Sequence, residues 1–339
     1  GVDDMQTTPT SFTATAFRPR CVSAIVASVG LLAVTAVASA QEAPSPRAGY
    51  AMAYDSVRDQ VILFGGRGES LGDGLNDTWI WSDAGWRKVD TEVSPPPLRY
   101  ACMAFDAKRS VAVLFGGWGE GNIAQSDTWE FDGQNWRLVD VGDKRPPARF
   151  LSAMTYDAGQ GKVVLFGGRD VRRRFLDDLW VYDGAGWTEI PAKGPYARGG
   201  HAMTYNPTRG TVVVMGGFTT AALNDAWEFD GKMWTQLSTS RVPARHIFAL
   251  AYDSDHDRLV LFGGAGRGAQ LNDTWFWADG EWVRGPSAGP VPRAYFSGVY
   301  RPGHGFLIFG GVTGGQRGDQ RVLNDMWRYD GQRWTPGWD

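Results

Sequence analysis

The sequence predicts an all-β protein built from six copies of one structural repeat. Two landmarks recur about every fifty residues. Each copy has a diglycine directly after an apolar run, and then two tryptophans seven residues apart. A period of this length indicates supersecondary units that must stack to bury their apolar faces. The repeats occupy approximately residues 44–94, 95–145, 146–194, 195–241, 242–289 and 290–339.

Each repeat contains four segments with the pattern of β-strands, which we call strands a to d. Strand a alternates and has a small residue at one position in every repeat, as expected where sheets converge on an axis. These residues are Ala51, Cys102, Ala153, Ala202, Ala249 and Ser297. Strand b is the apolar run, typical of a strand buried on both faces, and its diglycine permits unusual φ values. Strands c and d carry the tryptophans and flank a tight turn such as Asp132-Gly133.

These repeats resemble kelch repeats. The recurring motif is an arginine before strand a, a Tyr-Asp pair such as Tyr54-Asp55, the apolar run with its diglycine, an acidic residue and the spaced tryptophans. In the kelch family each repeat forms one blade of a β-propeller. The resemblance, which extends to secreted bacterial kelch proteins and the propeller domain of galactose oxidase, implies a six-bladed kelch β-propeller with four antiparallel strands per blade. Since one fold hosts many activities, the fold alone does not define the function.

The N-terminal residues have the pattern of a targeting segment. Residues 1–17 are polar, and we expect an unstructured extension. Residues 18–40 combine Arg18 and Arg20, the apolar stretch 21–37 and Ala38-Ser39-Ala40, which are the parts of a signal peptide. We predict cleavage after Ala40 and a secreted or periplasmic protein of residues 41–339. The alternative is an uncleaved helix that anchors the protein, because seventeen apolar residues approach the length of a membrane span.

Composition constrains the class of protein. The net charge is −3, and the lack of a basic excess argues against nucleic acid as a partner. Residues 41–339 contain one cysteine, Cys102, so no intramolecular disulfide is expected. Sixteen tryptophans supply much of the buried area of a single domain. We expect a monomer without a cofactor and, after cleavage, without membrane association.

Loop lengths indicate which face binds a ligand. In an antiparallel meander the a–b and c–d turns lie on one face, the turn face, and the b–c loops and d–a connections lie on the other, the loop face. The paired tryptophans are always seven residues apart, whereas the segments from diglycine to first tryptophan span 14, 13, 13, 11, 12 and 17 residues. Variation is confined to the loop face, where we expect binding.

An arginine precedes strand a in each repeat, on the loop face and near the axis. We call them the pre-strand arginines: Arg47, Arg99, Arg149, Arg198, Arg245 and Arg293. A ring of guanidinium groups would bind carboxylates. Alternatively, each pairs with an aspartate and ties adjacent blades, and the number of available aspartates favours this structural role. These aspartates are Asp77, Asp127, Asp178, Asp225, Asp273 and Asp325.

Residues that differ between repeats are the other candidates for ligand binding. Tyr100, Phe150 and His246 follow pre-strand arginines, and Trp118, Arg169 and Arg172 lie on b–c loops. Aromatic and arginine side chains are enriched in binding hot spots. They would suit a protein, a peptide or a glycan, and the arginines favour an acidic one.

The sequence contains little that indicates catalysis. The histidines lack metal-ligand spacing and no catalytic triad can be assembled. Kelch-type copper oxidases need a cysteine crosslinked to tyrosine, but Cys102 falls at a packing position. Sialic-acid mutarotases are six-bladed kelch proteins that act in the central channel, and such a carbohydrate-active enzyme is the alternative. We predict a non-enzymatic binding or scaffold module.

Ring closure has two possible forms. The first repeat starts at strand a and the last ends at strand d, so the chain ends do not obviously share a blade. The ring therefore closes by packing alone or borrows a short strand from residues 41–46.

Overall fold

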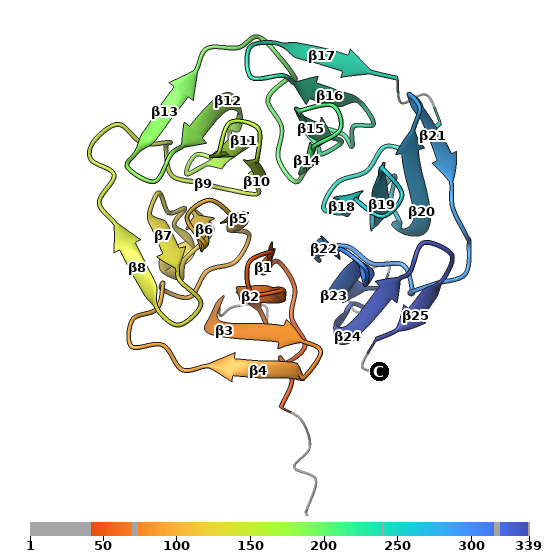
Figure 1. Cartoon of the computed structure of the whole chain (residues 1–339), viewed down its shortest axis with the longest axis horizontal. Coiled ribbons are helices and arrows are strands. Elements are labelled where there is room, and N and C mark those ends of the chain that lie inside the picture. The colour runs from red at the N-terminus through yellow and green to blue at the C-terminus, as the bar shows by residue number, and fades with distance from the viewer. Residues whose placement is uncertain (1–41, 70–73, 239–240, 315–318, 338–339) are drawn as a thin grey trace, which may run out of the picture. The chain divides into compact units, whose positions relative to one another are not determined.

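The computed structural model describes residues 42–69, 74–238, 241–314 and 319–337, which form six four-stranded antiparallel sheets around an axis. Figure 1 looks down this axis and shows the sheets as the blades of a propeller. The predicted fold is confirmed. The predicted extension and signal peptide, residues 1–40, lie outside the described residues.

Within each blade the chain runs from the innermost strand outward. Blade 1 consists of β1 (Ala51–Asp55), β2 (Gln60–Arg67), β3 (Gly74–Ser82) and β4 (Gly85–Val89). Blade 2 consists of β5 (Cys102–Asp106), β6 (Val111–Phe115), β7 (Thr128–Phe131) and β8 (Trp136–Val139). Blade 3 consists of β10 (Ala153–Asp157), β11 (Lys162–Asp170), β12 (Phe175–Tyr182) and β13 (Trp187–Ile190), with the short β9 (Arg149–Phe150) paired to β11.

The remaining three blades follow the same plan. Blade 4 consists of β14 (Ala202–Asn206), β15 (Thr211–Met215), β16 (Ala226–Phe229) and β17 (Trp234–Leu237). Blade 5 consists of β18 (Ala249–Asp253), β19 (Arg258–Ala265), β20 (Gln270–Ala278) and β21 (Glu281–Arg284). Blade 6 consists of β22 (Gly298–Arg301), β23 (Gly305–Thr313), β24 (Arg321–Tyr329) and β25 (Trp334–Pro336).

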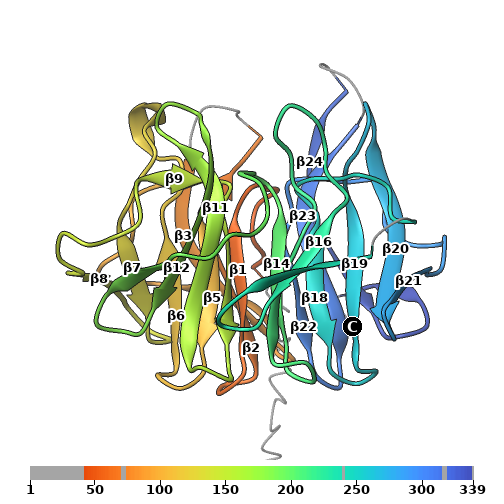
Figure 2. The same ribbon diagram turned by 90° about the horizontal axis from the view of Figure 1, so that it is seen from above.

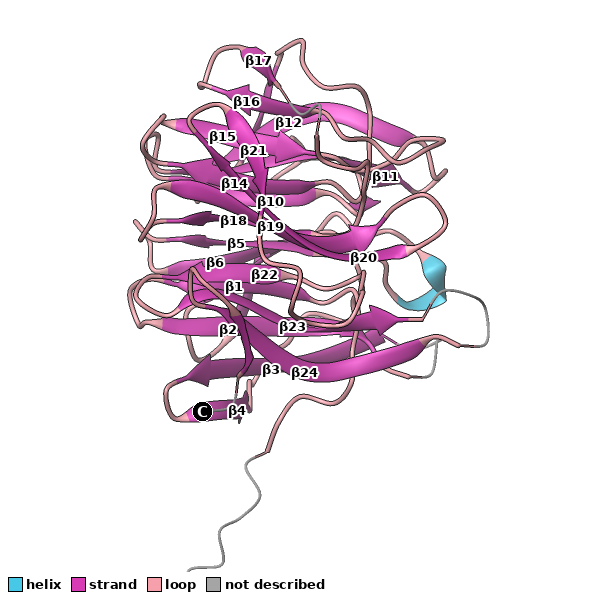
Figure 3. Cartoon of the chain, turned by 90° about the vertical axis from the view of Figure 1, so that its right-hand side faces the viewer, coloured by secondary structure: helices cyan, strands magenta, loops and turns pink. Residues whose placement is uncertain are grey.

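The two faces of the ring are distinct in side view. In Figure 2 the inner strands run along the axis and the loop face is at the top, where β9 lies. The one helical element of the described residues is the 3-10 turn η1 (Glu120–Asn122), which projects from the loop face in Figure 3.

The core lies between blades rather than within them. Each apolar cluster joins strands of neighbouring blades, as where Phe64 of β2 packs with Leu114 and Trp136 of blade 2. The second tryptophan of a blade contacts the strand b phenylalanine of the preceding blade edge to face, with Trp136 5.1 Å from Phe64 and Trp187 5.1 Å from Phe115 between ring centroids. Blades are therefore stabilised by their neighbours, as the repeat pattern predicted.

Three of these outer tryptophans also donate a buried hydrogen bond to the preceding blade. The acceptors are threonine hydroxyls of strand c, in the pairs Trp136–Thr78 (2.8 Å), Trp187–Thr128 (2.9 Å) and Trp334–Thr274 (2.9 Å). The threonine position holds Leu179 in blade 3 and Ala226 in blade 4, and the indole nitrogens of Trp234 and Trp282 are correspondingly buried without a partner among the described residues.

The diglycines lie where strand b bends away from strand c. In blade 1, Gly65 and Gly66 have φ values of 67° and 96°, and the β2–β3 register shifts at this point. A Cβ on Gly65 would lie 2.7 Å from the Leu98 carbonyl oxygen. Glycine is therefore required both by the left-handed backbone and by the close approach of the next blade.

A continuous belt of six backbone hydrogen bonds surrounds the axis on the loop face. Its residues lie just before strand a in each blade and have φ values between 55° and 63°. Each N–H donates to the carbonyl of the preceding blade's residue, in the pairs Gly49–Tyr295 (2.8 Å), Tyr100–Gly49 (2.6 Å), Leu151–Tyr100 (3.1 Å), Gly200–Leu151 (2.8 Å), Ile247–Gly200 (2.6 Å) and Tyr295–Ile247 (3.3 Å). We call this the axial belt.

The axial belt contributes to the closure of the ring. The Gly49–Tyr295 bond joins blade 1 to blade 6, and the Arg47 backbone donates to Leu323 (3.0 Å) and accepts from Gly311 (2.9 Å). Residues 42–46 form no strand, and blade 6 takes all its strands from residues 298–336. Of the two expected forms of closure the structure shows neither in full, because packing is supplemented by backbone hydrogen bonds from residues 47–49.

Candidate functional site

Five of the six pre-strand arginines are buried, and all three guanidinium nitrogens of each donate hydrogen bonds. Arg149, with no exposed side-chain surface, donates from Nη1 and Nη2 to the two oxygens of Asp178 at 2.7 and 2.6 Å. Nη1 also donates to the Gly167 carbonyl and Nε to the Pro147 carbonyl, both at 3.0 Å. The same arrangement recurs in the pairs Arg47–Asp77, Arg198–Asp225, Arg245–Asp273 and Arg293–Asp325.

Each of these ion pairs lies within one blade, while the backbone of its arginine bonds to the preceding blade. The Arg149 side chain bonds within blade 3, whereas its backbone carbonyl accepts from Gly117 of blade 2 at 2.8 Å. The first tryptophan of strand c completes the site, with Trp180 Nε1 donating to Asp178 Oδ2 at 2.7 Å. This geometry supports the structural alternative, since a buried guanidinium whose three nitrogens all donate and which already holds a bidentate carboxylate has no free face for a ligand carboxylate.

Electrostatics agree with the ion pairing. Burial by itself raises the pKa of the Asp178 carboxyl, but the hydrogen bonds and charge of Arg149, with the bond from Trp180, outweigh it and lower the pKa. The same balance lowers the pKa values of Asp77, Asp225, Asp273 and Asp325.

Blade 2 departs from this pattern, and Arg99 is not its pre-strand arginine. The backbone bonds that the pre-strand arginines make are made by Leu98, whose N–H donates to Leu75 (3.1 Å) and whose carbonyl accepts from Gly66 (2.8 Å). The predicted position of Arg99 is therefore wrong by one residue, because Leu98 occupies it. Arg99 instead donates from Nη2 to Asn122 Oδ1 at 2.7 Å.

The residue after each pre-strand position pairs across a β-bridge with the residue after the diglycine. We call these the rim pairs, since they surround the axis on the loop face. From blade 1 to blade 6 they are Ala48–Arg67, Arg99–Trp118, Phe150–Arg169, Gly199–Phe218, His246–Ala265 and Ala294–Val312. Arginines occur in blades 1 to 3 and aromatic rings in blades 2 to 4, whereas blade 6 has only small aliphatic residues.

The rim pairs of blades 2 to 5 form a connected aromatic and guanidinium surface. The Arg169 guanidinium carbon lies 4.7 Å from the Phe175 ring centroid and 6.0 Å from those of Phe150 and Phe218. Phe150 contacts Trp118 edge to face at 4.2 Å, and Phe218 lies 4.8 Å from His246. The structure thus brings together Trp118, Phe150, Arg169 and His246, which the sequence analysis selected separately.

Arg169 forms no ion pair with a carboxylate among the described residues. Its Nε and Nη2 donate to the Arg173 carbonyl at 3.1 and 2.9 Å, and the adjacent Asp170 pairs instead with Arg174 at 2.7 Å. Burial and the charge of Arg173 lower the pKa of Arg169. The site favours an anion that can reach the guanidinium from the loop face.

Other predicted residues lie around this surface. Tyr100 belongs to the axial belt and lies 5.8 Å from Tyr295 between ring centroids, while Arg172 is exposed on the blade 3 loop. Sequence reasoning missed Arg67 and Tyr295. Arg67 directly follows a diglycine, as Trp118 and Arg169 do, and this shared position could have identified it; its guanidinium lies 5.7 Å from the Tyr295 ring.

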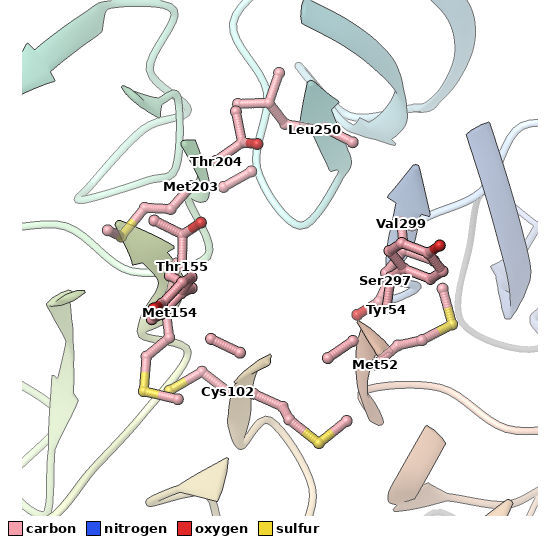
Figure 4. Close-up of a pocket in the computed structure, with 18 of the residues that line it drawn as sticks. Met52, Tyr54, Cys102, Met154, Thr155, Met203, Thr204, Leu250, Ser297 and Val299 are labelled. Carbon is pink, nitrogen blue, oxygen red and sulfur yellow. The ribbon is translucent and has the colours of Figure 1, made fainter. Parts of the chain in front are cut away.

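The central channel is uncharged. Its cavity of about 370 Å³ is lined by strand a residues, with no aspartate, glutamate, lysine or arginine among them. Figure 4 shows Thr155 and Thr204 beside the opening, and Met52, Met154 and Met203 turned away from its centre. His201 lines the channel, but burial lowers its pKa to about 3, so its ring is neutral.

Cys102 is a packing residue. It is buried at the channel wall with its Sγ 3.3 Å from Ser152 Oγ, and burial raises its pKa to about 11. Within the described residues no three acidic, histidine or cysteine side chains gather as metal ligands, and no helix there has the length and apolarity of a membrane span.

Comparison with known proteins agrees with the geometry. No curated protein matches the chain. The family model described as the KLHDC2/KLHL20/DRC7 Kelch-repeats domain matches residues 18–194 and 183–338. Together these matches cover most of the chain and all six blades, and the chain belongs to the kelch-repeat family.

Proposed function

We propose that this protein is a binding module that recognises a carboxylate-bearing segment of a partner protein on its loop face. Kelch propellers are typical scaffolds for protein–protein interaction, which supports a protein partner. The observation that carries the proposal is the asymmetry of the rim pairs. Six equivalent positions surround the axis, but only blades 1 to 3 place arginines there, and blade 6 places alanine and valine.

Arg169 is the centre of the proposed surface. Its guanidinium is already held by the Arg173 carbonyl and by the Phe175 ring, so a carboxylate that binds it immobilises little additional side chain. The neighbouring aromatic rings supply apolar contact area of the kind found in hot spots. Exposed Arg172 and Arg173 extend the positive charge, which would accelerate association with an acidic segment at low salt.

Selection from a displayed random-peptide library tests the proposal. The wild-type domain, residues 41–339, should enrich peptides that combine Asp or Glu with aromatic residues. Arg169→Gln should lose at least tenfold of that affinity, a change of about 1.4 kcal/mol. The matched control is Arg284→Gln, which changes an exposed arginine on the outer strand β21. Enrichment without acidic residues, or equal losses in the two variants, would contradict the proposal.

An enzymatic role in the channel has no support from a particular group. A mutarotase-like reaction needs an acid or a base beside the substrate, and the described channel residues include no carboxylate or lysine and a neutral His201. The proposed module therefore acts by binding. Export stays a prediction from residues 18–40, and N-terminal sequencing of the protein from separated cell fractions would test cleavage after Ala40.

A further inference from the structure

Blade 2 retains most of a guanidinium site without the guanidinium. In five blades a buried arginine is held by a strand c aspartate, by the carbonyl of the first diglycine residue and by the carbonyl two residues before it. A tryptophan indole donates to the same aspartate. Blade 2 keeps Asp127, Gly116 and Trp129 at these positions but has Leu98 in place of the arginine.

Two side chains of the blade 2 site, Trp129 and Asp127, lack hydrogen-bond partners in the part of the chain that the structure describes. Trp129 is buried, with 8% of its surface exposed, and its Nε1 has no acceptor among the described residues. In blade 3, by contrast, Trp180 Nε1 donates to Asp178. No side chain of the described residues donates to the half-buried Asp127 carboxylate. Blade 2 therefore lacks both the arginine and the tryptophan–aspartate hydrogen bond of the other five blades, and a cation that held the Asp127 carboxylate would restore the first of these contacts.

Leu98 does not replace the arginine chemically. Its buried side chain joins the apolar cluster between blades 1 and 2, as the aliphatic part of an arginine would. A leucine ends at Cδ, however, so residue 98 supplies nothing at the positions of Nε, Cζ and the two Nη atoms. Those four atoms carry all the charge and all the donors of the other five sites.

We propose that blade 2 binds a guanidinium group presented from outside the chain, with Asp127 as its bidentate acceptor. The planar fork of a guanidinium matches a carboxylate and a neighbouring carbonyl, whereas an ammonium ion provides no such fork. Pro97 and Arg99, which flank Leu98 in the chain, line a cavity of about 350 Å³ on the loop face together with Trp118. The site is separate from Arg169, so this inference and the proposed function can fail independently.

Methylguanidinium is the probe. At concentrations near ten times its dissociation constant it should raise the Tm of the wild-type domain by about 2–3 °C relative to methylammonium at equal ionic strength. Leu98→Arg fills the site from within and Asp127→Asn removes the acceptor, so neither variant should respond. In parallel, the indole N–H resonance that disappears in Trp129→Phe should shift during titration of the wild type.

Three results would overturn the proposal. The first is an equal Tm response in wild type, Leu98→Arg and Asp127→Asn. The second is a Trp129 indole resonance that does not shift during the titration. The third is a Tm response that appears only in Arg99→Gln, which would mean that Arg99 fills the site in the wild type. A positive control is available, because Arg198→Ala empties the equivalent site of blade 4 and should be rescued by methylguanidinium. If that variant does not fold, the wild-type and Leu98→Arg titrations still decide.

The source of the guanidinium is distinguished by a second titration. A blocked Gly-Arg-Gly peptide that binds at least tenfold more tightly than methylguanidinium would identify a partner's arginine side chain. Equal affinities would identify a small guanidinium compound. Binding of the corresponding Gly-Lys-Gly peptide with the same affinity as Gly-Arg-Gly would contradict guanidinium recognition.

Discussion

Removing a carboxylate from the same position in two blades should have very different effects. Asp178→Asn takes away the charge partner of Arg149, while Asp127→Asn makes the identical chemical change in blade 2, where Leu98 stands in place of the arginine. The matched pair separates the ion pair from every general consequence of placing asparagine on strand c.

The magnitude follows from burial. The Arg149 side chain has no exposed surface and Asp178 has 18%, so the guanidinium cannot turn to water when its partner is neutralised. Leaving one member of a buried pair uncompensated costs about 3–5 kcal/mol. Asn keeps one acceptor oxygen, which places Asp178→Asn near the lower end, about 3 kcal/mol, or a Tm lower by about 6 °C. Asp127→Asn should stay within about 0.5 kcal/mol.

Calorimetric melting and urea denaturation would measure this on four proteins, which are the wild type, Asp178→Asn, Asp127→Asn and Arg149→Leu. Arg149→Leu reproduces the blade 2 combination and should cost less than Asp178→Asn, because the carboxylate left behind reaches solvent and the guanidinium does not. Equal Tm losses for the two asparagine variants would refute the assignment of the pre-strand arginines as blade ties.

Three further perturbations test other parts of the structure. The paired aspartates have lower pKa values in the folded than in the unfolded state. Their contribution to stability is therefore complete above about pH 4 and is lost as the pH falls through the folded-state pKa values. Thermal melts from pH 7 to 2.5 should show this loss, and the difference in Tm between wild type and Asp178→Asn should narrow in acid. Thr128→Val leaves the Trp187 indole without its acceptor and should cost about 1–3 kcal/mol in urea unfolding, against no measurable change for the exposed Thr188→Val. Gly49→Ala should lower the Tm more than Gly142→Ala, because both glycines have positive φ but only the Gly49 Cβ would clash, at 2.5 Å from the Tyr100 ring.

The repeat made much of the fold predictable. Diglycines and tryptophan pairs at constant spacing define six hairpin units, and small residues at the position of Ala51 indicate the axis, which the channel lining confirms. The register of blade 2 was not predictable in the same way. Arg99 lies one residue closer to the start of its strand a than the other pre-strand arginines do. Its residue type matched the motif although its spacing from Cys102 did not, so the position was assigned to Arg99 instead of Leu98.

The candidate surface was predictable by residue type but not by arrangement. Aromatic and arginine side chains on the loop face were identified individually. Their grouping depends on β-bridges such as Phe150–Arg169, which join residues of different segments and leave no periodic trace in sequence. The burial of Arg149 likewise follows from the approach of two blades rather than from its neighbours in the chain.

The axial belt means that the ring can close only when synthesis of the chain is nearly complete. The Gly49 N–H belongs to the first blade made during synthesis, yet its acceptor, the Tyr295 carbonyl, precedes the last blade, 246 residues later from the difference of their numbers. Until that carbonyl emerges, five blades form an open arc whose two ends each expose one blade's apolar flank. The last blade covers both apolar flanks at once. A chain shortened by one repeat would therefore keep two exposed apolar blade surfaces, and we expect it to associate with other copies of itself until the ring is closed.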